Sequence, residues 1–116
     1  MDPQAVREHA QAHCDALLAG DVDRAAAELS AELRSNLGPL LALLPLPLTE
    51  ATVESIEKSG SGYNVVLHLV GETDRVRLQT RWKDRDGRPT IVEASHLVEP
   101  AEPVAEGEQA EAESGG

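Results

Sequence analysis

The first third of the chain carries apolar residues at the spacing of amphipathic helices. Residues that recur every three or four positions fall on one side of a helix, and residues 4–19 follow this period. Gly20 is a favourable C-terminal stop, and Asp21 can cap a second helix. The pattern therefore predicts two helices, over about 4–19 and 22–36. The inward positions of the first helix are Val6, Ala10, His13, Cys14 and Leu17.

A leucine- and proline-rich segment, residues 37–48, interrupts this pattern. It holds seven leucines and three prolines, and it is too short and too broken by proline to span a bilayer. Pro39 can begin one helical turn, whereas Pro45 and Pro47 force an extended path. We expect the leucines to close one end of the core. The alternative is an exposed lip that binds a partner.

From Thr49 onward the period changes to two, which predicts β-strands. Four strand-like runs, over about 50–58, 63–70, 75–83 and 89–98, are separated by short segments with the composition of hairpin turns. Consecutive hairpins give an antiparallel meander. Because the helices precede the strands, the fold class is α+β, with N-terminal helices packed on a four-stranded antiparallel sheet.

The turn of the second hairpin fixes its register. With Glu72 and Thr73 at the tip, residue 63 lies opposite residue 82, and each strand presents alternate residues to one face. One face is apolar and must be the core. It holds Tyr63, Val65, Leu67, Leu69, Val76, Leu78, Thr80 and Trp82. The outer face holds Asn64, Val66, His68, Val70, Arg75, Arg77, Gln79 and Arg81.

The outer face of this hairpin combines apolar and basic side chains. Val66, His68 and Val70 lie beside Arg77 and Arg81 in the expected register. The cluster of basic residues is thereby explained as the outer stripe of one strand and requires no bound anion. Because the valines on this face gain from being covered, we expect a homodimer through these five residues.

The third hairpin can turn in two ways, and the choice sets the direction of Glu93. A two-residue turn at Asp86 and Gly87 pairs 82 with 91 and 80 with 93, which points Glu93 into the core. A three-residue loop that begins at Arg85 and contains a bulge turns Glu93 outward, toward basic residues. We favour this second form, because an unpaired buried carboxylate is costly. It also points Thr90, Val92, Ala94 and His96 inward and leaves Ile91 and Leu97 outside.

Charge divides the chain into two parts. The formal net charge is −11, yet six of the 21 acidic residues and none of the ten basic residues follow residue 98. We expect one domain over 1–98 and a disordered acidic tail over 99–116, because the tail is almost wholly Glu, Ala, Pro, Gly and Ser. The acidic balance argues against nucleic acid and against a membrane surface as partners.

A single cysteine, Cys14, excludes an internal disulfide, and the start of the chain lacks the pattern of a signal peptide. We therefore expect a cytoplasmic location. On the apolar side of its helix, Cys14 is expected to be a small buried residue rather than a nucleophile. His9 and His13 have the spacing of two metal ligands, but no motif supplies further ligands, so we expect no metal and no cofactor.

The order of the elements resembles a known superfamily. Two helices joined by Ala16-Leu-Leu-Ala-Gly-Asp21, followed by a meander that ends in Arg81-Trp-Lys-Asp-Arg-Asp-Gly-Arg-Pro-Thr-Ile-Val-Glu93, are similar to nuclear transport factor 2-like proteins. These include ketosteroid isomerase and the polyketide cyclases. The resemblance covers residues 4–98 and implies a curved sheet that wraps the helices into a cone with an internal pocket, often in a homodimer. The chain is shorter than typical members, with the leucine- and proline-rich segment in place of much of the third helix.

The isomerase branch of this superfamily implies a carboxylate base with a Tyr and a second acid. Glu93 and Tyr63 are the groups that the chain offers for these roles, but the catalytic residues do not map cleanly. Two functions stay open. We favour a non-enzymatic module that forms a dimer or binds a small apolar ligand over an isomerase- or cyclase-type enzyme that uses an inward Glu93. The side chains expected to line a cavity are His13, Tyr63, Thr80, Trp82 and His96.

Overall fold

The computed structural model describes residues 1–97 of the chain. The end of the fourth predicted strand and the predicted tail over 99–116 lie outside these residues. The fold opens with helix α1 (Pro3–Ala19), where the Asp2 carboxylate accepts a hydrogen bond from the Ala5 amide at 2.7 Å. Gly20 ends the helix in the left-handed conformation, as its position in the sequence predicts.

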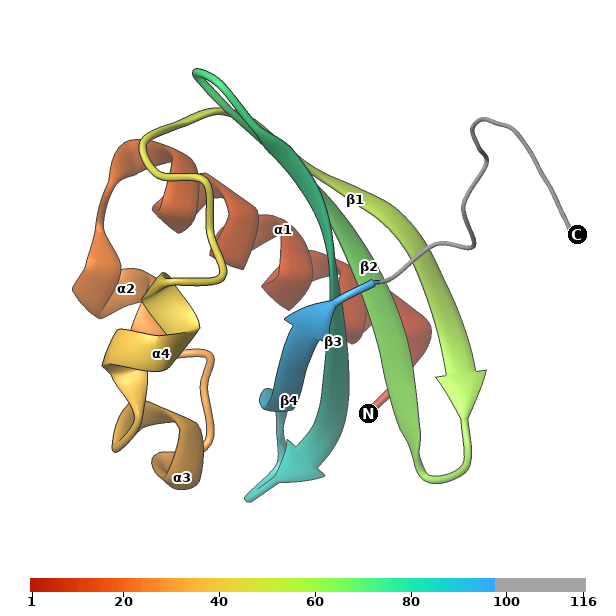
Figure 1. The fold of residues 1–116 in the computed structure, drawn as a ribbon. Coiled ribbons are helices and arrows are strands. Elements are labelled where there is room, and N and C mark those ends of the chain that lie inside the picture. The colour runs from red at the N-terminus through yellow and green to blue at the C-terminus, as the bar shows by residue number, and fades with distance from the viewer. Residues whose placement is uncertain (98–116) are drawn as a thin grey trace, which may run out of the picture.

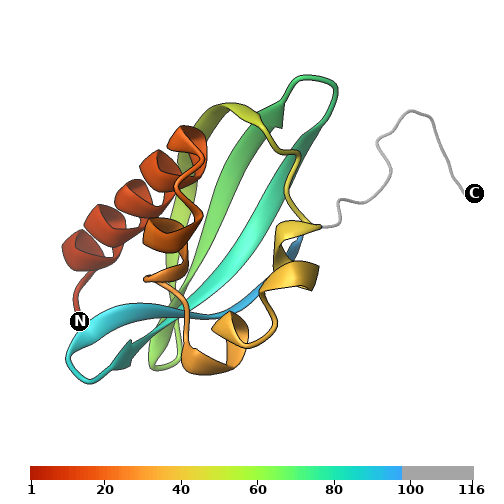
Figure 2. The ribbon, with the colours of Figure 1, turned by 90° about the vertical axis from the view of Figure 1, so that its left-hand side faces the viewer.

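Four antiparallel strands follow the helices: β1 (Leu48–Ser59), β2 (Gly62–Gly71), β3 (Arg75–Arg85) and β4 (Arg88–His96). Their order in the sheet is β1-β2-β3-β4, which confirms the predicted α+β meander. The sheet curves around one side of the molecule, and α1 runs along its inner face (Figure 1). Figure 2 shows the remaining short helices grouped over the part of this face that α1 leaves open.

The core lies between α1 and the inner face of the sheet. Helix α1 packs mainly against β1, and alternate residues of β2 and β3 close the opposite side. The largest side chains that are fully enclosed are Trp82, Leu67, Leu69, Ile91, Val6, Val65, Thr80 and Cys14. With one Trp, one Tyr and no Phe in the chain, aliphatic residues supply nearly all of this core.

The predicted second helix, over 22–36, is wrong in its length. The structure has α2 (Val22–Ala26) and α3 (Ala31–Arg34), separated by a turn at residues 27–28 and by Leu29 and Ser30. Leu29 forms a parallel bridge with Ile91, and the Ser30 amide donates to the Ile91 carbonyl at 2.9 Å. The helix breaks because its backbone completes the open edge of β4. The Ser30 hydroxyl then caps α3.

The second hairpin has the predicted register, with Tyr63 opposite Trp82 and Val70 opposite Arg75. The three-residue loop that the sequence analysis favours for the third hairpin is wrong. Its turn is the two-residue one, since Arg85 pairs with Arg88, and both turn residues have positive φ, 55° at Asp86 and 84° at Gly87. Positive φ at both positions is the requirement of a type I′ turn.

A bulge then changes the register of β4. Trp82 pairs with Ile91, but Arg81 pairs with Glu93, so Val92 is the extra residue. Glu93 is exposed, as expected. It points outward because the extra residue Val92 shifts the register of β4, and not because of the turn. Ile91 is fully buried, which corrects its predicted outward position. The bulge lets Ile91 and Ala94, three residues apart, face the same interior.

Candidate functional site

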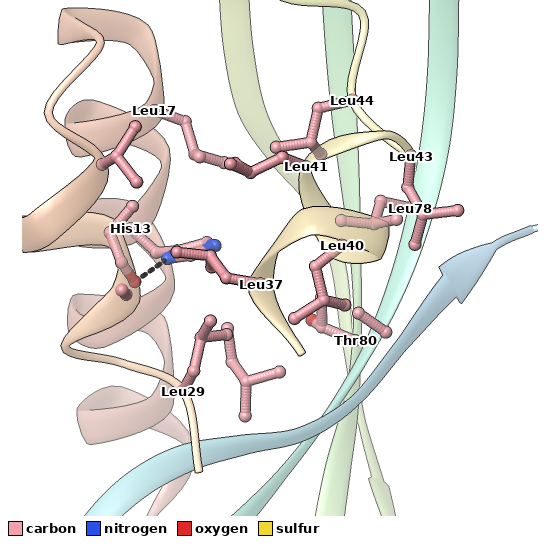
Figure 3. A pocket seen from close by; sticks show the side chains of 15 residues that line it. His13, Leu17, Leu29, Leu37, Leu40, Leu41, Leu43, Leu44, Leu78 and Thr80 are labelled. Atoms are coloured by element: carbon pink, nitrogen blue, oxygen red, sulfur yellow. Dashed lines mark hydrogen bonds between the residues drawn. The ribbon is translucent and has the colours of Figure 1, made fainter. Parts of the chain in front are cut away.

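A small apolar cavity lies where the short helices meet the inner face of β3 and β4. Its volume is about 50 Å³, and apart from one imidazole and one hydroxyl its lining is aliphatic. Figure 3 shows side chains from the helices and from the sheet converging on it. From α1, α2 and the sheet the lining includes His13, Leu17, Ala26, Leu78, Thr80 and Ala94.

The outer wall of the cavity is a segment that we call the lid, residues 37–47, which contains helix α4 (Leu37–Leu41). Asn36 at its start makes no side-chain capping bond, and no residue of α4 is fully buried. Five partly buried leucines of the lid nevertheless line the cavity, which agrees with the expectation that this segment closes one end of the core. They are Leu37, Leu40, Leu41, Leu43 and Leu44.

Two contacts near its C-terminal end hold the lid to the sheet. The Nε2 of His96 lies 2.6 Å from the Leu43 carbonyl oxygen and donates to it. Pro45 passes so close to Gly71 that a Cβ added there would lie 2.2 Å from the Pro45 carbonyl oxygen. Gly71 is therefore the residue that lets the lid approach the backbone of β2.

His13 is the one titratable residue that lines the cavity within residues 1–97. Its side chain leaves α1 toward α2, and its Nδ1 donates to the Ala25 carbonyl oxygen at 3.1 Å. Burial lowers the pKa of His13 from 6.5, and the nearby charge of Glu28 opposes this shift. The imidazole is therefore neutral at pH 7.

The hydroxyl of Thr80 reaches the same cavity but is occupied by protein partners. It donates to the Val65 carbonyl oxygen at 2.9 Å and accepts from Trp82 Nε1 at 2.8 Å. This chain of bonds satisfies the indole of the largest core side chain. The Thr80 hydroxyl therefore bonds to core groups, and only its methyl group and its remaining lone pair are available to the cavity.

Three of the five predicted cavity residues lie elsewhere. Trp82 is packed inside the core without lining the cavity, and Tyr63 borders a separate surface hollow together with Lys58 near the start of α1. His96 is exposed and acts on the lid from outside, through Leu43. Of the five, only His13 and Thr80 line the cavity as the sequence predicts.

The two residues of the enzymatic alternative do not meet. Tyr63 shares the inner face with Trp82, which lies opposite it, whereas Glu93 lies opposite Arg81 on the outer face. Within residues 1–97 no Asp or Glu lines the cavity. The arrangement therefore lacks the carboxylate that an isomerase-type proton transfer would need beside an apolar substrate.

The outer sheet face has the residues that the sequence assigns to it. Val66, His68 and Val70 are half-buried there. The Arg77 guanidinium forms a two-pronged ion pair with the Glu54 carboxylate, and this hydrogen bond lowers the pKa of Glu54. Arg81 donates to Asn64 and to the Ser59 carbonyl oxygen, at 3.1 and 3.0 Å. These basic residues thus have intramolecular partners.

Sequence reasoning missed the role of Glu28. This largely buried carboxylate accepts from His9 Nδ1 at 3.0 Å and lies 3.3 Å from Arg88 Nη2, so it joins α1 to β4. These ion pairs could not be predicted, because the expected continuous helix over 22–36 would not direct Glu28 toward His9 and Arg88. His9 and His13 have different partners, and the described residues contain no group of three or more potential metal ligands.

Cys14 is fully buried, and desolvation, with a smaller effect of Asp15, raises its pKa to about 12. It lies on the buried side of α1 and does not line the cavity. None of the helices described in residues 1–97 has the length and hydropathy needed to cross a lipid bilayer.

Solved structures share this arrangement. One, titled an "NTF-2 like protein of unknown function" from Burkholderia xenovorans LB400, matches with a TM-score of 0.61 at 17% identity, over 87% of this chain and 89% of that chain. Another, titled a "putative ketosteroid isomerase" from Kribbella flavida DSM 17836, matches with a TM-score of 0.56 at 16% identity, over 86% and 83%. No family model and no curated protein matches the chain. Likeness at these identities concerns the fold, which hosts many functions.

Proposed function

From the nuclear transport factor 2-like fold that this chain has, we propose a non-enzymatic module that binds a small apolar molecule under the lid. The observation that carries the proposal is the cavity itself. It is lined almost wholly by aliphatic side chains, and its outer wall is a separate short segment rather than part of the sheet. Apolar lining with few polar groups is typical of sites for small molecules.

The size of the cavity requires the lid to move. Ligand pockets commonly have volumes of roughly 300–1,000 Å³, whereas this cavity has about 50 Å³. Helix α4 has five residues, and helices of this length have little stability of their own. Its hold on the domain comes from the leucines that face the cavity, together with the contacts of Leu43 and Pro45. A ligand that replaces the leucine contacts can displace the lid.

The absence of a carboxylate from the cavity lining supports binding over catalysis within the described residues. An apolar cavity with one neutral imidazole can hold and orient a molecule. It offers no pair of groups to move a proton between two positions of a substrate.

The test is a titration of isotope-labelled protein with toluene, followed by two-dimensional NMR. We expect saturable shifts of the amides of His13, Leu40, Leu78 and Ala94, which surround the cavity. Ala26→Leu should weaken binding at least about tenfold, because Ala26 lines the cavity and the larger side chain fills it.

Ala27→Leu is the matched control. Ala27 is the next residue, is exposed and does not line the cavity, so this variant should bind toluene as the unmodified chain does. Shifts that do not saturate, or that spread over the surface without involving these amides, would refute the proposed function. Equal weakening by the two variants would place the toluene outside the cavity.

A further inference from the structure

The imidazole of His13 has one nitrogen that faces the cavity and has no hydrogen-bond partner among residues 1–97. Nδ1 donates to the Ala25 carbonyl oxygen, and no hydrogen bond among residues 1–97 involves Nε2. Figure 3 shows the ring with Nδ1 on the dashed bond and the second nitrogen turned toward the leucines of the lid. The residue is only 6% exposed.

The chemistry of Nε2 follows from the bond on the other side of the ring. A carbonyl oxygen can only accept, so Nδ1 must carry the proton. Burial lowers the pKa of His13, which keeps the ring neutral at pH 7. In a neutral ring with a protonated Nδ1, Nε2 presents a lone pair. It is therefore a hydrogen-bond acceptor fixed in position inside an aliphatic cavity.

Such an acceptor gains from a donor and is left unsatisfied beside an apolar group or another acceptor. We propose that the site selects apolar molecules that carry one hydroxyl group, and that His13 Nε2 accepts the hydrogen bond from this hydroxyl. The proposal rests on the proposed binding function and adds the class of ligand to it. The neutral imidazole cannot donate from Nε2, so the corresponding ketone gains nothing there.

Thr80 does not provide a hydrogen-bond donor that would let a ketone bind as well as an alcohol. Its one hydroxyl proton is donated to the Val65 carbonyl oxygen, and one of its two lone pairs accepts from Trp82, so Thr80 has no proton left to donate to a ligand. The remaining cavity residues carry aliphatic side chains. A ketone oxygen would thus find no side-chain donor among the described lining residues, whereas a hydroxyl group finds Nε2.

The test compares cyclohexanol with cyclohexanone, two molecules of similar shape of which only the alcohol can donate. Dissociation constants are measured by NMR titration at about pH 7.5 for the unmodified chain, His13→Leu and His13→Gln. We expect the ratio of the ketone constant to the alcohol constant to fall about tenfold in His13→Leu, which removes the acceptor. His13→Gln can place its side-chain oxygen near the position of Nε2, so it should retain most of the preference.

The outcomes separate this inference from the proposed function. If toluene binds under the lid and the ratio is the same in the unmodified chain and His13→Leu, the inference is wrong and the proposed function stands. If none of the three molecules binds, the proposed function fails. The ratio compares two ligands on one protein, so a general loss of stability in a variant does not imitate the expected result. A spectrum of the free variant verifies that it is folded.

Discussion

Trp82 Nε1 donates a hydrogen bond to Thr80 Oγ1, two residues earlier on the same strand, and both residues are fully buried. The Thr80 hydroxyl passes the chain on to the Val65 carbonyl oxygen of β2. Thr80→Val should therefore lower the free energy of unfolding by about 1–3 kcal/mol, because it leaves the buried indole N–H without a partner. Urea unfolding followed by Trp82 fluorescence measures this.

Thr80→Ser is the matched control, since it keeps the hydroxyl and loses a methyl group. It should cost less than Thr80→Val, although it removes more packing volume. The reverse order would show that the methyl group, and not the hydrogen-bond chain, determines stability at this position.

His13 should make stability depend on pH. Burial lowers the pKa of His13 in the folded chain below 6.5. Just below pH 6.5 the imidazole is therefore protonated to a greater extent in the unfolded chain than in the folded chain. The free energy of unfolding then falls as pH decreases from 6.5 toward the folded-state pKa, and His13→Leu should flatten this part of the profile. The charge of Glu28 attracts a protonated imidazole and so reduces the effect. Identical slopes in urea titrations of the two proteins would contradict this prediction.

Cys14 should be unreactive in the folded chain. The thiol is fully buried, and its pKa is raised to about 12, so little thiolate exists at neutral pH. A chromogenic disulfide reagent should label it only after unfolding in urea. The control moves the thiol to the surface with Cys14→Ala and Leu18→Cys combined, since Leu18 is 44% exposed, and should react at once. Rapid labelling of native Cys14 would indicate that the core opens readily.

Leu40→Ala should lower the stability of the fold and increase its affinity for an apolar ligand. Leu40 is a partly buried lid residue that lines the cavity, so its truncation enlarges the space under the lid and loosens the lid. We expect a cost of about 1–2 kcal/mol in unfolding and severalfold tighter toluene binding. Leu46→Ala is the control, because Leu46 is 43% exposed and does not line the cavity. Equal effects of the two substitutions on affinity would contradict a specific role of the lid leucines that line the cavity.

Pairing of two copies through the outer sheet face stays a prediction of the sequence. Val66, His68 and Val70 lie half-buried on this face beside the Arg77–Glu54 ion pair. Light scattering at tens of micromolar should report a dimer for the unmodified chain and a monomer for Val66→Asp, which brings a charge into the proposed contact. A monomer of the unmodified chain at this concentration would refute the prediction.

The sequence was informative wherever local chemistry decided the structure. Gly20 ends α1 as the capping rule predicts, and the turn at Glu72 and Thr73 set the register of the second hairpin. The core face of β2 and β3 followed from that register. His13 could be predicted for the site because its helix has a clear apolar side.

The remaining features depend on contacts between distant segments. The second helix breaks because Leu29 and Ser30 pair with Ile91, about sixty residues later, and no local pattern reveals that pairing. The bulge at Val92 could not be predicted from the turn of the third hairpin, because both possible turns keep a single register through β4. Apolar residues three apart, at 91 and 94, were the available signal.

The contact of Pro45 with Gly71 shows that the lid lies over the sheet without adding a strand to it. The dimensions of the cavity thus depend on the lid, whose backbone is not held by pairing with a strand of the sheet. Protein engineers could exchange this stretch for others of different bulk and obtain a series of receptors on one unchanged frame.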